Sequence, residues 1–156
     1  MTDTLKSICE QCTNLHDPQL EFIPEESRRQ KDIILRDLKE LLSAAALEQE
    51  KTVVVLAGGL FEAILYSFIQ AQRNYIAARR GSFTFDPDQS LDNYVSIFNR
   101  WFSDTFSIPD SIVGYRDIVH LNRELQHPSD VCPRAAREML RLLDSLIVKL
   151  AGPVEP

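Results

Sequence analysis

The sequence is poor in glycine, in cysteine and in the motifs that mark common enzyme classes. Five glycines, with most of the eight prolines in segments that read as linkers or chain ends, suit long helices joined by few turns. Three cysteines make no disulfide framework, and their odd number is typical of a reducing compartment. The sequence has no Gly-rich phosphate loop, nucleophile elbow or dinucleotide fingerprint, which excludes the classes that those motifs define.

A targeting segment is also lacking. Residues 1–16 contain no apolar stretch of the kind that a secretory signal needs. The longest apolar run, from Val53 to Ile69, is about 17 residues long and contains Glu62, which is at the low end for a membrane span. We therefore predict a cytoplasmic protein that does not bind membranes, with this run as a buried core helix.

The composition is that of a folded domain. Of the 156 residues, 44% are hydrophobic and 26% are charged, which is enough to build a real core. The net charge of −6 disfavours non-specific binding to nucleic acid or anionic membranes. Nearly all of the excess negative charge lies in residues 1–50, which hold 11 acidic and 6 basic side chains. A local basic face therefore remains compatible with the rest of the chain.

Apolar residues recur at helical spacing along most of the chain. They predict helices over about 2–15, 25–48, 51–79, 91–106, 110–126 and 133–150. The predicted fold is all-α, a helical bundle of five or six helices in one domain, 1–156. Residues 1–24 form an N-terminal extension, 25–150 the bundle and 151–156 a tail. The second helix has its apolar positions at Ile33, Ile34, Leu38, Leu41, Leu42 and Ala45.

The predicted helix that ends at His127 carries a line of basic side chains. Arg116, His120, Arg123 and His127 follow one another at spacings of four, three and four, which places them in a narrow stripe beside the apolar face. Asn122 projects from that apolar face, where its amide needs hydrogen-bond partners. Histidine is a general acid or base and arginine stabilises phosphate charge, so the stripe has the chemistry to cleave RNA without a metal. A solvated basic edge is the competing interpretation.

The segment YRDIVHLNRELQHP, from Tyr115 to Pro128, resembles the HEPN superfamily (higher eukaryotes and prokaryotes nucleotide-binding). The signature of that superfamily is an Arg, usually followed by a polar residue such as Asn, with a His a few residues later at a helix end. The helix from Val54 to Phe68, which contains Glu62, and the helix from Ser90 to Phe106 fit the same pattern. The resemblance covers roughly residues 50–150.

One position departs from the family pattern Arg-Asn-x-x-x-His. That pattern would place the Arg five residues before His127, where this sequence has Asn122, and Arg123 follows it. The dipeptide is therefore inverted. Arg116 is the other nearby Arg, three turns before His127 on the same face.

The resemblance implies a HEPN-like bundle that acts on or near RNA. In its active form it would be a homodimeric, metal-independent endoribonuclease of a toxin or defence type, with no cofactor. His127, Arg123 and Arg116 would be its catalytic residues, and Asn122, His120 and Glu62 would support them. Other members of the superfamily have lost the motif, so the alternative is a non-catalytic interaction or structural domain that binds a cognate protein partner.

Three further features of the sequence are open to more than one interpretation. Cys9, Cys12 and His16 have part of the spacing of a zinc site, but no second pair of ligands is suitably spaced, so we expect no metal. Glu62 could meet the stripe across the bundle or reach solvent at the helix margin. The last helix carries basic residues that either extend a phosphate-binding face or form a solvated one: Arg134, Arg137 and Arg141.

Overall fold

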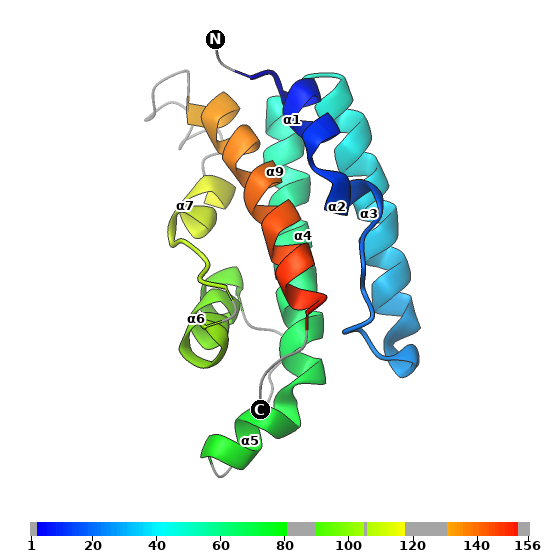
Figure 1. Cartoon of the computed structure of the whole chain (residues 1–156). Coiled ribbons are helices and arrows are strands. Elements are labelled where there is room, and N and C mark those ends of the chain that lie inside the picture. Colours follow the sequence, from blue (N-terminus) through cyan, green and yellow to red (C-terminus); the bar gives the residue numbers. More distant parts are fainter. Residues whose placement is uncertain (1–2, 81–89, 105, 118–130, 153–156) are drawn as a thin grey trace.

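The computed structural model describes residues 3–80, 90–104, 106–117 and 131–152, and all of the regular structure in these ranges is helical (Figure 1). The predicted all-α bundle is therefore confirmed for the described part of the chain. In chain order the helices are α1 (Leu5–Gln11), α2 (Thr13–His16), the 3₁₀ turn η1 (Glu25–Ser27), α3 (Arg28–Ala46), α4 (Glu50–Ala71), α5 (Arg73–Arg80), α6 (Leu91–Phe102), α7 (Ser111–Asp117) and α9 (Val131–Leu150).

Two predicted helices are each divided in the structure, which is why the described ranges contain eight α-helices. The segment predicted over 2–15 forms α1 and α2, which meet at Cys12. The segment predicted over 51–79 breaks at Gln72, where φ is −98° and ψ is 12°. The Arg73 guanidinium donates to the carbonyl oxygen of Gln70 at 2.8 Å. This bond caps the last turn of α4, and α5 then leaves the α4 axis (Figure 1).

Helix α4 is the centre of the bundle. It packs against α3 on one side, α6 and α7 on the other, and α9 in front (Figure 1). Its length and composition would allow it to cross a membrane, yet 61% of its most apolar window is buried inside the protein. The largest of its buried side chains include Phe61 and Phe68, and the Phe68 ring meets Phe22, Phe98 and Phe102. The burial expected for the apolar run is therefore observed.

One face of α4 is partly exposed in the described part of the chain. Along it, Val55 and Gly59 are exposed and Glu62 is partly buried. A Cβ atom added to Gly59 would meet no atom of the described residues within 4 Å.

A single carboxylate joins the α3–α4 turn to the start of α1. The amide of Glu48 donates to Ala45 and the amide of Gln49 to Ala44, which closes α3 with the paired hydrogen bonds of a Schellman turn. Glu48 itself has φ 57°, the left-handed conformation that usually requires glycine. Its carboxylate accepts hydrogen bonds from the amides of Leu5 (3.1 Å) and Lys6 (2.9 Å). The first turn of α1 thus gains both hydrogen-bond acceptors and a favourable negative charge.

Helix α2 is capped in the same way from the other side of the bundle. Asp144, on α9, accepts from the backbone amide of Asn14 at 2.9 Å and from its side-chain amide at 3.2 Å. The N-terminal segment that carries α1 and α2 also contributes buried side chains to the hydrophobic core of the bundle. They are Leu5, Ile8, Leu15, Leu20 and Ile23. Residues 4–24 therefore pack as part of the bundle.

Candidate functional site

The structure describes only part of the predicted site. Glu62 lies on α4 and is the one predicted site residue whose side chain can be placed. Arg116 is the penultimate residue of α7, and only its backbone is described. The remaining four residues, His120, Asn122, Arg123 and His127, lie outside the described residues. The described elements that flank these four residues are α7, which ends at Asp117, and α9, which begins at Val131.

The chain enters α7 through a connection held by one side chain. Asn99, on α6, accepts from the amide of Ile108 and donates to the carbonyl oxygen of the same residue, both at 2.8 Å. Ile108 is only 2% exposed, so its backbone groups have little access to water. The Asn99 amide satisfies both of them, as a neighbouring strand would. This pair fixes where α7 begins.

A second polar contact holds the other end of α7. The Tyr115 hydroxyl donates to the carboxylate of Glu138 on α9. Burial, the hydrogen bond to Glu138 and the negative charge of that carboxylate together raise the pKa of Tyr115. The nearby charge of Arg134 acts in the opposite direction. Helix α7 is thereby attached to α9 close to the point where the chain leaves it, and it also packs against α4.

Glu62 lies at the margin of α4 rather than in the core. It is partly buried and lies one turn after the exposed Gly59. The same helix packs against α7.

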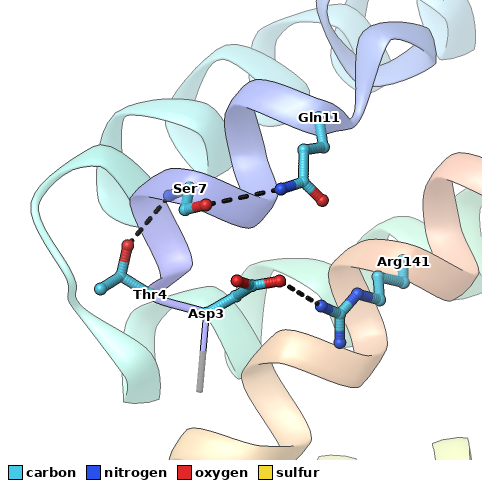
Figure 2. A network of polar contacts seen from close by, with 5 residues as sticks. All are labelled: Asp3, Thr4, Ser7, Gln11 and Arg141. Carbon is cyan, nitrogen blue, oxygen red and sulfur yellow. Dashed lines mark hydrogen bonds and ion pairs between the residues drawn. The ribbon is translucent and has the colours of Figure 1, made fainter. Parts of the chain in front are cut away.

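The arginines of α9 differ in their surroundings. Arg141 pairs with Asp3 at 3.2 Å, at the end of the bundle where Thr4 caps the first turn of α1 through the amide of Ser7 (Figure 2). Arg134, one turn before Glu138, is exposed and lies near Tyr115. Arg134 is therefore close to α7, whereas Arg141 faces the start of the N-terminal helix.

The two cysteines of the CxxC segment are structural. The Cys9 thiol donates to the carbonyl oxygen of Leu42 at 3.9 Å, and Cys12 donates to that of Leu140 at 3.8 Å. Burial is the main cause that raises both pKa values, that of Cys12 to about 12. A zinc ligand must be a thiolate, which this environment disfavours. Within the described ranges no three His, Cys, Asp or Glu side chains form a metal-binding group.

The polar contacts around α7 were not predicted from the sequence. The contact between Tyr115 and Glu138 joins residues 23 apart in the sequence and is apparent only once α7 and α9 are packed together. For Asn99 the sequence holds a weak indication of a structural role, because this polar residue lies four residues after Val95 on an otherwise apolar face of its helix. A polar side chain at such a position requires partners.

The chain was compared with protein-family models, with curated proteins and with solved structures, and no match was found in any of the three.

Proposed function

We propose that the protein is a HEPN-like, metal-independent endoribonuclease of a toxin or defence type that acts in the cytoplasm as a homodimer. The observation that carries the proposal is the placement of α7, the helix that contains Arg116. It packs against α4, which bears Glu62, and is fastened to α9 by Tyr115 and Glu138. The stripe begins on this helix, so the backbone of its first residue, Arg116, has a defined position.

The proposed reaction needs only RNA and the side chains of the stripe. The 2′-hydroxyl of a nucleotide attacks the adjacent phosphorus and loses its proton to His127. The bond from phosphorus to the 5′-oxygen breaks as the cyclic 2′,3′-phosphate forms. The 5′-oxygen takes up a proton from water, and His127 returns to water the proton that it accepted. Arg123 and Arg116 neutralise the charge that develops on the phosphoryl oxygens. Asn122, His120 and Glu62 orient these groups.

The sequence contains two Arg-His pairs at a spacing of four residues, Arg116 with His120 and Arg123 with His127. Cleavage of a panel of RNAs is measured in the presence of a chelator for the wild type, His127→Ala and His120→Ala. The proposal predicts wild-type cleavage with cyclic-phosphate ends. It also predicts a loss of about 10²–10⁴-fold in His127→Ala and a smaller loss in His120→Ala. Full activity in His127→Ala contradicts the assignment of His127.

The second candidate function is a non-catalytic domain that binds a protein partner. The inverted Asn122-Arg123 dipeptide and the net charge of −6 favour it. An active toxin impairs the growth of its expression host, whereas a binding domain does not. Normal growth, together with no RNA cleavage by the wild type, would replace the ribonuclease proposal with this one.

A further inference from the structure

A cavity of about 660 Å³ is lined by residues of the first turns of α3 and the last turns of α4. These turns lie at the end of the bundle where α5 begins (Figure 1). This volume lies within the range of roughly 300–1,000 Å³ that is usual for small-molecule sites. The proposed RNA site begins on α7, which does not line this cavity. The inference therefore does not depend on the proposed function.

The polar part of the cavity wall has an ordered series of hydrogen bonds. The Ser67 hydroxyl donates to Oε1 of Gln30 at 3.0 Å, and Nε2 of Gln30 donates to Oε1 of Gln70 at 3.2 Å. Ser67 is buried, and its bond fixes the orientation of the first amide. Within the described ranges, Nε2 of Gln70 has no hydrogen-bond acceptor. The series therefore ends in an amide donor on the cavity wall.

The charged part of the wall is positive, although the protein as a whole is acidic. Arg29 and Arg73 line the cavity together with a single carboxylate, that of Glu26. Neither arginine forms an ion pair with a carboxylate in the part of the chain that the structure describes. Both are exposed, and the Arg29 guanidinium can turn toward a ligand. Arg73 donates through Nη1 to the carbonyl oxygen of Gln70, and its other N–H groups remain for a ligand. A guanidinium group recognises carboxylates and phosphates, because it can donate two parallel hydrogen bonds.

The remaining wall is apolar. Ile33 was expected on the buried face of its helix, yet it is 37% exposed and lines the cavity. The ring of Tyr66 is held edge-on against Tyr94, with 6.1 Å between the ring centroids. Its orientation is therefore fixed by the core, and it provides a rigid wall. A flat apolar group can pack between Tyr66 and Ile33.

We propose that this cavity binds a small organic anion, whose carboxylate or phosphate group lies between Arg29 and Arg73 and whose apolar body packs on Tyr66 and Ile33. Nε2 of Gln70 donates to a polar atom of the ligand. Both kinds of ligand carry a single anionic group on a flat apolar body, and binding of matched probes distinguishes a carboxylate from a phosphate.

The test uses the full chain and three small aromatic probes. Benzoate carries a carboxylate, phenyl phosphate carries a phosphate, and benzyl alcohol has a similar body without the charge. Binding is followed by two-dimensional NMR, which reports both the affinity and the backbone amides that shift. We expect saturable binding of at least one anion, with shifts centred on residues 26–33 and 66–73, and weaker binding of the alcohol. The tighter of the two anions identifies the group that the natural ligand carries.

Matched arginine variants test the assignment of the charged wall. Arg29→Gln and Arg73→Gln should each weaken binding of the anion by roughly tenfold, because each removes a charge-assisted hydrogen bond. Arg28→Gln is the control, since Arg28 lines a separate cavity with Lys31 and Asp32 on another side of α3. His127→Ala should also leave the affinity unchanged, which separates this site from the proposed RNA site.

Three results would overturn the proposal. They are no saturable binding of either anion up to about 10 mM, equal affinity for benzyl alcohol, or an equal loss of affinity in Arg28→Gln and Arg29→Gln. Ile33→Glu provides a second variant that does not remove a capping bond. It introduces a negative charge at an exposed position and should abolish binding of both anions while the melting temperature stays close to that of the wild type.

Discussion

Helices α1 and α7 have the same length, seven residues, but they are attached to the bundle differently. The first turn of α1 is capped by the carboxylate of Glu48, and its buried side chains include Leu5 and Ile8. Among the described side chains of α7, only Ile112 is fully buried. Its position depends on two polar contacts, from Asn99 to Ile108 before the helix and from Tyr115 to Glu138 at its end.

The difference separates the part of the molecule that holds the fold from the part proposed to carry the function. The N-terminal helices share the core with α3, α4 and α9, so we expect them to unfold only with the whole bundle. Helix α7 has less apolar burial and should open locally at a lower free energy. A region that binds or cleaves a substrate is commonly held in this way, since it must adjust around its ligand.

Asn99→Ala should have the largest effect. It removes both partners of the Ile108 backbone, and each unsatisfied buried group costs about 1–3 kcal/mol. We expect the free energy of unfolding to fall by about 3 kcal/mol, measured by chemical denaturation. The matched control is Asn93→Ala, because Asn93 is exposed on the same helix, and this change should be nearly neutral. Equal effects of the two substitutions would show that the Asn99 contact does not hold α7.

Glu48→Ala should have the next largest effect. It removes the cap on α1 and leaves a non-glycine residue in the left-handed conformation, so we expect a loss of about 1–2 kcal/mol. Glu48→Gly loses the same cap but relieves the backbone, and should recover about 1 kcal/mol of stability relative to the alanine variant. Thermal denaturation of both variants checks the order. A glycine variant less stable than the alanine variant would contradict this account of the turn.

Alkaline pH should lower the free energy of unfolding, because the buried Cys12 thiol in the N-terminal region then titrates. Its pKa is raised from 9.0 to about 12 in the folded protein, so the unfolded chain loses the thiol proton first. The contribution of the protonated Cys12 thiol to the free energy of unfolding is therefore fully present below pH 9. It should be lost as the pH rises from 9 toward 12. Cys12→Ser keeps a donor to Leu140 without a titration in this range, and should reduce the slope of stability against pH. An unchanged slope would rule out Cys12 as its source.

Gly114→Ala should have the smallest effect, and in the stabilising direction. A Cβ atom at Gly114, on the exposed side of α7, would meet no atom within 4 Å. Alanine should therefore favour the helix by about 0.5–1 kcal/mol. Gly59→Ala is the matched variant on α4, where the added Cβ is also unobstructed. If α7 opens locally, Gly114→Ala should slow exchange in α7 alone, whereas Gly59→Ala should raise the global free energy of unfolding.

Much of the fold follows from the spacing of apolar residues. The apolar residues that recur at helical spacing along α9 are buried: Leu140, Leu143, Leu146, Ile147 and Leu150. Ile33 was misplaced because the spacing shows an apolar stripe but not which of its edges is left uncovered, and in the structure Ile33 lines the cavity between α3 and α4. Glu48 in a left-handed turn and the break at Gln72 could not be predicted either, since both depend on contacts beyond the local sequence.

The candidate site was less accessible to sequence analysis than the fold. The stripe of Arg116, His120, Arg123 and His127 is predicted from their spacing and stays a prediction, because three of the four lie outside the described residues. The contacts that position α7 join segments that are distant in the sequence. Asn99 bonds the backbone before the helix, and Glu138 accepts from Tyr115 near its end. Pairings of that kind appear only once the helices are packed.

The most direct test of the comparison is native-state hydrogen exchange of the wild type, resolved residue by residue. We expect the amides of α7 to exchange through local openings of lower free energy than those of α1, with a weak dependence on denaturant. The amides of α1 should exchange together with those of α4 through global unfolding. If α7 and α1 opened with the same free energy and the same denaturant dependence, the proposed division of the molecule would be wrong.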